Sequence, residues 1–291
     1  MTGARIAIAS CKKLPDREVD DMPFVEALAA RGAVAETIPW DDAATDWSAF
    51  DACVIRTTWD YTARRDEFVA WARRIAATTP IFNPPDIIEW NTHKGYLRQV
   101  ASGGVPIIDT VWLDRGTDVD LEAVLRERGW QRGFMKPAVG ASSESTCRFD
   151  RTPEALSRAT THARSVLASH DLLLQPYLES VESEGEASAI LIDGVVTHCV
   201  RKIPVKGDYR VQDDYGASDE LFDASEAFLD IARRAGACAA DDLLYARADF
   251  LLDGGGHWRL TELELVEPSL FFRHCPEAAE HLATSLLRRL A

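Results

Sequence analysis

Lysine is scarce in this sequence, and basic residues are too few to balance the acids. Six of the 32 basic residues are lysine, which leaves 26 arginines, and 47 acidic residues oppose them. The formal charge is therefore -15 and the pI ≈ 4.9. A surface this negative repels phosphate backbones and anionic lipid headgroups, so we expect neither nucleic acid nor membrane as a partner.

Long apolar runs, paired cysteine motifs and zinc-ligand spacings are also lacking. No stretch reaches the ~18 apolar residues of a membrane span, and the first residues resemble a buried strand broken by Arg5 rather than a secretion signal. The six cysteines are scattered singly, which is typical of reduced thiols. The histidines lack zinc spacing. We expect a soluble cytoplasmic protein without structural zinc.

Strands alternate with helices in the first third, which predicts a parallel sheet. We expect strands at 5–10, 33–39, 52–57 and 80–82, and helices at 17–31 and 64–77. The middle third predicts helices at 93–102 and 153–169 and strands at 105–113, 132–137, 145–150 and 171–176. The last third predicts antiparallel hairpins, with strands at 187–192, 195–204, 244–252 and 257–266 and helices at 223–238 and 277–290.

The last hairpin carries the densest group of chemical side chains. Residues two apart on a strand point to the same face, so Arg247 shares a face with Asp249, and Glu262 with Glu264. Converging carboxylates repel one another unless a cation lies among them, and oxygen ligands suit Mg²⁺. The same alternation is also typical of a solvated sheet face, but Glu267 shortly afterwards favours the metal.

Two other stretches favour an anionic ligand. Lys136 leads into a loop of small residues that includes Ser142 and Ser143; such residues let backbone N–H groups approach phosphate, although the loop is also typical of a plain hairpin. In RKIPVKGDYR, four cations fall within ten residues. They indicate either an anionic ligand or pairing with nearby acids.

Arg56 stands at the carboxyl end of the strand expected at 52–57. Open α/β sheets bind ligands in the crevice outside such ends. Arg56 is therefore expected either to bind a substrate carboxylate through two N–H groups or to pair with Asp60. The sequence alone favours neither of these two interpretations.

Taken in order, these motifs resemble the ATP-grasp superfamily of ATP-dependent carboxylate–amine ligases. The resemblance extends from about Lys94 to Ser269. It is similar to the glutathione-synthetase-like, ribosomal-protein glutamate ligase and D-alanine–D-alanine ligase branches. It implies an α/β and α+β fold class: a Rossmann-like substrate domain over 1–92, a small ATP-grasp lobe over 93–172, and a C-terminal lobe with the metal site over 173–291.

The resemblance implies that the protein binds ATP. Lys94, in NTHKGYL, would open the nucleotide region, Lys136 would reach the adenine and α-phosphate, and Glu186 would take the ribose hydroxyls. The implied nucleotide contacts are Lys94, Lys136, Ser142, Ser143, Gln175, Tyr177, Leu178, Glu186 and Lys202. The sequence departs from the family at two of these places. The hinge between the two lobes, around 175–178, has Gln175 where Glu is frequent, and the loop expected over the phosphates, 139–145, lacks a second glycine.

The resemblance also implies Mg²⁺, held by Asp249, Glu262 and Glu264. In a third departure, Glu264 replaces a frequent Asn, which leaves Glu267 as the alternative last ligand. The implied catalytic residues are two arginines: Arg210, in GDYRVQ, facing the γ-phosphate, and Arg247, facing the charge that develops in transfer.

The chemistry implied by the family is formation of an acyl phosphate and its attack by an amine. The strings RTTWDY, ELELVEPSLFF and VRKIPVKGDYRVQ are most similar to small-molecule ligases around the cycloserine-forming cyclo-ligase, which closes an O-ureido-serine ring. The substrate would then be small and amino-acid-like, with contacts from Arg56, Trp59, Tyr61, Ser269 and Arg273. The resemblance further implies a homodimer.

Three alternatives remain. The chain could be a non-catalytic, regulatory ATP-binding protein, or a ligase that adds amino acids to peptides or proteins. A dinucleotide-dependent oxidoreductase is disfavoured, because the first strand ends in SCKK with no G-x-G-x-x-G.

Overall fold

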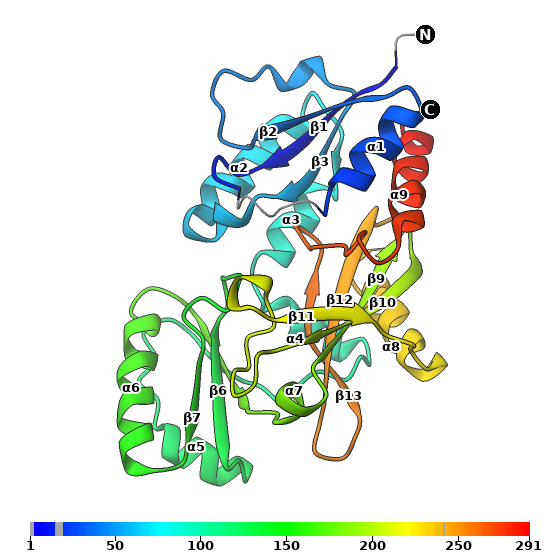
Figure 1. The fold of residues 1–291 in the computed structure, drawn as a ribbon. Helices are drawn as coiled ribbons and strands as arrows, with labels where there is room; N and C mark the ends of the chain where they lie inside the picture. Colours follow the sequence, from blue (N-terminus) through cyan, green and yellow to red (C-terminus); the bar gives the residue numbers. More distant parts are fainter. Residues whose placement is uncertain (1–2, 15–19, 241) are drawn as a thin grey trace.

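The computed structural model describes residues 3–14, 20–240 and 242–291. Three sheets organise these residues (Figure 1): a parallel sheet from the first third, a small antiparallel sheet from the middle, and a five-stranded antiparallel sheet from the last third. In the part of the chain that is described, no helix is both long and apolar enough to cross a membrane.

The parallel sheet confirms the expected α/β N-terminal region. Its strands pair in the order β2-β1-β3-β4, with β1 (Arg5–Ser10), β2 (Val34–Pro39), β3 (Ala52–Thr57) and β4 (Ile81–Phe82). One face packs against α2 (Arg65–Ala76) and an aromatic cluster of Trp40, Phe68 and Trp71. The short helices η1 (Trp47–Ala49) and η2 (Trp59–Arg64) lie in the connections.

The other face of this sheet packs against two helices from distant parts of the sequence. There α1 (Met22–Ala30) lies alongside α9 (Pro276–Arg289), as Figure 1 shows, and Phe24 and Leu28 share a core with Leu282 and Leu286. The first part of the helix expected over 17–31, residues 17–19, lies outside the described residues.

The middle sheet pairs antiparallel in the order β5-β8-β6-β7, with β5 (Val111–Leu113), β6 (Arg132–Pro137), β7 (Cys147–Asp150) and β8 (Leu172–Pro176). Helices α5 (Leu121–Arg128) and α6 (Pro153–Leu167) contribute to its core beside Met135 and Leu174. The lobe boundary expected between residues 172 and 173 falls inside β8, so this sheet extends to Pro176.

The C-terminal sheet confirms the expected antiparallel hairpins. Its order is β11-β10-β9-β12-β13, with β9 (Glu186–Ile192), β10 (Val195–Ile203), β11 (Ser218–Leu221), β12 (Tyr245–Leu252) and β13 (Trp258–Glu264). Helix α8 (Glu226–Ala237) packs on it. Asp193 and Gly194 turn the first hairpin at φ of 53° and 77°, the left-handed backbone that a two-residue turn requires.

The N-terminal and C-terminal sheets are joined by a buried polar contact. The amide of Asn83 donates to the carbonyls of Tyr245 (3.0 Å) and Leu265 (2.8 Å), and its oxygen accepts from Leu244 N (2.8 Å). The chain then forms α3 (Pro85–Asn91) and α4 (Tyr96–Ser102). The remaining short helices are α7 (Ser180–Ser183) and η3 (Asp213–Tyr215).

Some expected elements differ. The strand expected at 105–113 is wrong as one element: Ile107 bridges to Leu260 of the C-terminal sheet, and only 111–113 enter the middle sheet. Helices α3 and α5 are additional. Helix α3 begins at Pro85, and proline is favourable at the first helical position because its missing N–H has no helical partner there.

Candidate functional site

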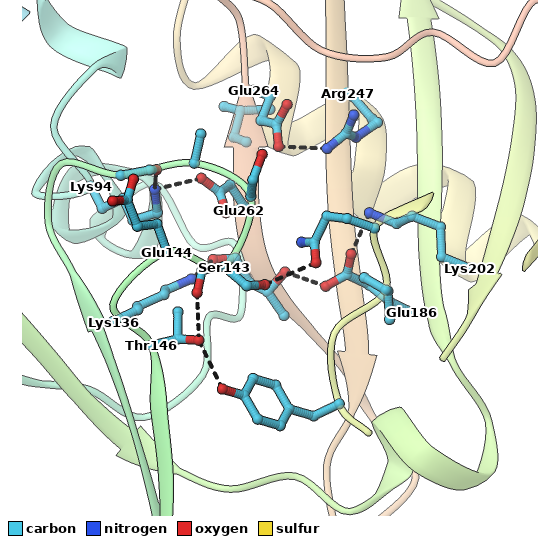
Figure 2. A pocket seen from close by; sticks show the side chains of 18 of the residues that line it. Lys94, Lys136, Ser143, Glu144, Thr146, Glu186, Lys202, Arg247, Glu262 and Glu264 are labelled. Carbon is cyan, nitrogen blue, oxygen red and sulfur yellow. Dashed lines mark hydrogen bonds and ion pairs between the residues drawn. The ribbon is translucent and has the colours of Figure 1, made fainter. Parts of the chain in front are cut away.

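A cavity of ≈ 620 Å³ lies between the middle sheet and the C-terminal sheet. Strands β6 and β8 of the middle sheet form one wall, and β12 and β13 of the C-terminal sheet form the opposite one. The N-terminal domain contributes Trp59 and Tyr61. Figure 2 shows charged side chains converging on this space from both walls. A volume of this size suits a small-molecule ligand.

The last hairpin brings its charged residues together as its alternation predicts. Arg247 of β12 pairs across the ladder with Glu264 of β13, and Asp249 pairs with Glu262. Arg247 donates through Nε to Asp249 Oδ1 (3.0 Å) and through Nη2 to Glu264. The carboxylates are therefore held beside one another by an arginine from the same sheet.

Two lysines from different segments pair with the other acids of this group. Lys94 Nζ lies 2.8 Å from Glu262 Oε1 and donates to the Gly140 carbonyl at 2.6 Å. Lys202 of β10 pairs with Glu186 and lies 3.4 Å from Asp249 Oδ1. All of these side chains border the cavity except Asp249, which is 2% exposed beneath it.

The crowding of charge shifts several pKa values. Burial raises the pKa of Glu264 to about 8, and the neighbouring charges of Asp249, Glu262 and Glu267 add to the rise against the effect of Arg247. Burial likewise raises the pKa of Glu267. Burial alone would raise the pKa of Asp249, but the positive charges of Arg247 and Lys202 outweigh it and hold this pKa well below its usual value. The hairpin therefore carries more acid than its own cations offset, which is what a bound cation would correct.

The carboxylates do not form a ready-made metal cage. Within residues 3–14, 20–240 and 242–291, no three acidic, histidine or cysteine side chains are placed to hold a metal ion as they stand. Asp249, Glu262 and Glu264 instead each contact a lysine or arginine. Mg²⁺ generally binds through one or two carboxylates plus phosphate oxygens and water, so these hard oxygen donors fit the ion once phosphates are present.

The other end of the cavity is lined by the middle lobe. Lys136 of β6 is buried and donates to the Thr261 carbonyl at 2.9 Å, and burial lowers its pKa. Gln175, Tyr177 and Leu178 border the cavity from β8 and its continuation, at the hinge expected from the sequence. Gln175 Nε2 donates to Thr110 Oγ1 at 2.9 Å.

The loop of small residues between β6 and β7 closes one side of the cavity. Ser142, Ser143 and Ser145 adopt φ of 50°, 56° and 55°, a left-handed conformation that favours glycine. Ser143 Oγ donates to Gln212 Oε1 (2.9 Å), and the Ser142 carbonyl accepts from Tyr215 OH (3.2 Å). The loop thus contacts the segment that carries Arg210.

Arg210 lies on that segment but does not border the cavity as far as the structure describes it. Its guanidinium is held by Asp208, with Nη2 2.7 Å from Oδ2, and lies 3.9 Å from the centre of the Tyr215 ring. The arginine holds the pKa of Asp208 at about 2. A contact with phosphate therefore requires Arg210 to leave this pair.

Two expected substrate residues occupy supporting positions instead. Arg56 is fully buried, and pairing with Asp60 is wrong: Arg56 Nε donates to Asp21 at 2.7 Å and Nη2 to the Pro268 carbonyl at 2.9 Å. Asp60 accepts from Trp40 and Arg64. Neither Arg56 nor Arg273 is among the described residues that border the cavity.

Arg273 contacts a group of acids that do not include the carboxylates of the last hairpin. It pairs with Asp219 and lies 3.4 Å from Asp213 Oδ2 and 3.6 Å from Asp20 Oδ1. Trp59, Tyr61 and Ser269 do border the cavity, as expected. The ion pairs of Arg56 and Arg273 thus lie outside the set of described residues that border the cavity, and both remain predictions as substrate contacts.

Sequence reasoning missed an aromatic group and one phenylalanine of the cavity wall. Phe134, Tyr177 and Tyr209 approach within 5.4 to 6.5 Å between ring centres, of which only Tyr177 was expected. Phe271 borders the cavity beside Ser269. These residues come from separate segments with no shared spacing, so no local pattern could identify them.

The chain is similar over its length to one group of proteins. Residues 6–83 match the family of the D-cycloserine synthetase DcsG N-terminal domain. The cycloserine biosynthesis protein DcsG of Streptomyces lavendulae is 32% identical over 286 residues, covering 94% of each chain. A crystal structure of D-cycloserine synthetase DcsG superposes with a TM-score of 0.90 at 29% identity, covering 99% of this chain and 100% of that one.

A more distant solved structure agrees in fold. The RimK domain ATP-grasp protein of Sphaerobacter thermophilus superposes with a TM-score of 0.69 at 17% identity, covering 98% of this chain and 100% of that one. At this identity the likeness concerns the fold alone.

Proposed function

The chain belongs to the family of the D-cycloserine synthetase DcsG and is an ATP-dependent carboxylate–amine ligase with the ATP-grasp fold, and from this premise we propose that it cyclises a small ureido amino acid. The observation that carries the proposal is the cavity of ≈ 620 Å³, which is lined both by Lys94, Lys136 and Lys202 and by Trp59, Tyr61 and Ser269.

The proposed reaction has two steps. A carboxylate oxygen of the substrate attacks the γ-phosphorus of ATP, the bond from that phosphorus to ADP breaks, and an acyl phosphate forms. A nitrogen of the same molecule then attacks the acyl carbon, phosphate leaves, and the nitrogen loses its proton to solvent. Such transfers depend on positioning and charge neutralisation, which matches a cavity lined by three lysines and Arg247.

Buried cations would hold the phosphates. Lys94 and Lys136 lie on one side of Glu262, and Lys202 lies on the other beside Glu186 (Figure 2). The proposed nucleotide contacts are Lys94, Lys136, Ser142, Ser143, Gln175, Tyr177, Leu178, Glu186 and Lys202, all of which border the cavity. Because Lys136 is buried among apolar atoms as well as acids, a phosphate would restore its favourable charge contact.

Asp249, Glu262 and Glu264 would hold Mg²⁺, which supplies charge neutralisation between the β- and γ-phosphates when bound. Arg247, fixed by Asp249 and Glu264, would stabilise charge at the acyl centre. Arg210 would turn from Asp208 to the γ-phosphate and acyl phosphate.

The N-terminal domain, proposed over 1–92, would close the end of the cavity that takes the substrate carboxylate. We call this the acyl end, and it is bordered by Trp59, Tyr61 and Ser269. Trp59 and Tyr61 face the segment 266–271 across the cavity. Arg56 and Arg273 support this segment from behind, as their contacts with the Pro268 carbonyl and with Asp20 indicate. The aromatic side chains of Trp59, Tyr61 and Phe271 at this end favour a small substrate.

The test is turnover by the full chain with Mg²⁺-ATP and O-ureido-D-serine. We expect one ADP and one phosphate for each cyclised product found by mass spectrometry. ADP release with amino-acid pairs or with a peptide, and none with the ureido acid, would replace the cyclase proposal with a linear or peptide ligase.

A further inference from the structure

Phe271 lies at the acyl end of the cavity with an unusual backbone. Its φ is 50°, a left-handed conformation that a bulky side chain rarely adopts. The residue is 4% exposed and borders the cavity together with Val266, Glu267 and Ser269. A strained conformation of this kind persists only where surrounding contacts hold it.

Asp20 of the N-terminal domain supplies those contacts. Its Oδ2 accepts from Phe271 N at 3.0 Å, Leu270 N at 2.9 Å and Ser269 Oγ at 3.1 Å. Asp20 is 4% exposed, so these charge-assisted bonds form in a water-poor place. One carboxylate therefore holds the backbone N–H groups of Leu270 and Phe271 and the side chain of Ser269, and two of these three residues border the cavity.

The ring of Phe271 also lies close to two cations. The guanidinium of Arg247 lies 5.8 Å from the ring centre, and that of Arg273 lies 4.8 Å from it. Arg247 also donates through Nη1 to the Ser269 carbonyl at 3.1 Å. Since Arg247 is itself bound to Asp249 and Glu264, it links the segment around Phe271 to the charged residues of β12 and β13.

We propose that Phe271 sets the length limit of the acyl substrate and that Asp20 is the residue that positions it. This inference rests on the proposed function, since it concerns the pocket for the acyl substrate. A rigid ring wall excludes an extra methylene, and an added methylene in a fitted pocket changes kcat/KM by ~10–200-fold. The expected specificity is for short amino acids over their one-carbon homologues.

The test compares O-ureido-D-serine with O-ureido-D-homoserine, which is one methylene longer. In Phe271→Ala and in the milder Phe271→Leu, we expect the ratio of kcat/KM for the longer to the shorter substrate to rise about 10-fold or more. Phe272→Leu is the matched control: its side chain is buried in the core behind the wall, and we expect the ratio to stay unchanged.

Asp20→Ala separates positioning from general stability. We expect it to shift the substrate ratio in the same direction as the Phe271 variants and to raise the KM for the acyl substrate, with the KM for ATP unchanged. An unchanged ratio in both Phe271 variants, while the wild type turns over the shorter substrate, would overturn the inference alone. Lack of any wild-type turnover with either ureido acid would instead reject the proposed function.

Discussion

The ammonium of Lys94 lies 2.8 Å from Oε1 of Glu262, joining the segment between α3 and α4 to the charged hairpin. The same ammonium donates to the Gly140 carbonyl at 2.6 Å, so it also holds the start of the loop of small residues between β6 and β7. The Lys94 side chain is 9% exposed. One lysine therefore joins a proposed metal ligand to the loop that would cover the phosphates.

Replacing Lys94 by methionine should lower kcat/KM for ATP by about 100-fold or more. Loss of one partner of a buried pair costs about 2–5 kcal/mol, and ~2.7 kcal/mol corresponds to 100-fold. Lys12→Met is the control, because Lys12 is 61% exposed and pairs only at the surface, with Asp41. Steady-state kinetics with the melting temperature measured in parallel check this, and equal kinetics for the two variants would contradict it.

Arg210→Ala should lower kcat by about 100-fold or more while ATP still binds within a few-fold of wild type. The physical reason is that Arg210 is held by Asp208 outside the cavity, so its contribution belongs to transfer rather than to ground-state binding. Binding is measured by calorimetry with a non-hydrolysable ATP analogue. The surface arginine Arg233 on α8, replaced by alanine, should leave both quantities unchanged. Loss of ATP binding in Arg210→Ala would assign it to ground-state binding.

The choice of last metal ligand can be tested with two matched amide variants. Glu264 stands on β13 two residues from Glu262, and it shares Arg247 with Asp249, whereas Glu267 lies beyond the strand. We expect Glu264→Gln to raise the Mg²⁺ concentration for half-maximal rate at least about 10-fold, since a charged ligand is lost. Glu267→Gln should raise it less than about threefold. The reverse order would make Glu267 the ligand.

The hairpin shows what sequence alone could predict. A period of two places Arg247, Asp249, Glu262 and Glu264 on shared faces, and the observed register pairs 247 with 264 and 249 with 262. Alternation and turn residues are local properties, so they also predicted most of the helices and strands. Which cation would offset each carboxylate was beyond local pattern.

The partners of Arg56 and the role of Phe271 show why. The arginine pairs with Asp21, 35 residues away, and not with the nearby Asp60. Phe271 depends on Asp20, which is 251 residues away. Such contacts are set by how α1 and the segment after β13 pack together, and one sequence carries no periodic signal for packing between distant segments.

The stability of the contact between the N-terminal and C-terminal sheets should depend on Asn83. Its side chain makes three buried hydrogen bonds to Leu244 N, the Tyr245 carbonyl and the Leu265 carbonyl. Each such bond contributes ~1 kcal/mol, and the backbone groups left unpaired add to the loss. We expect Asn83→Ala to lower the free energy of unfolding by about 3 kcal/mol in urea titration. Asp86→Ala, whose side chain is 92% exposed, is the control and should change it by less than about 0.5 kcal/mol.

The turn between β12 and β13 should make stability depend on pH through Asp253. Against burial, the N–H groups of His257 and Gly255 and the guanidinium of Arg259 lower the pKa of Asp253 to about 2. Because this folded value lies below the unfolded value of ~3.9, the carboxylate stabilises the fold fully above about pH 5. That stabilisation is lost as pH falls through 4 towards 2. We expect the destabilisation by Asp253→Asn, measured by urea unfolding, to be about half as large at pH 3 as at pH 7. A difference that stays constant over this range would show that the charge of Asp253 contributes nothing and that only the shape of the turn matters.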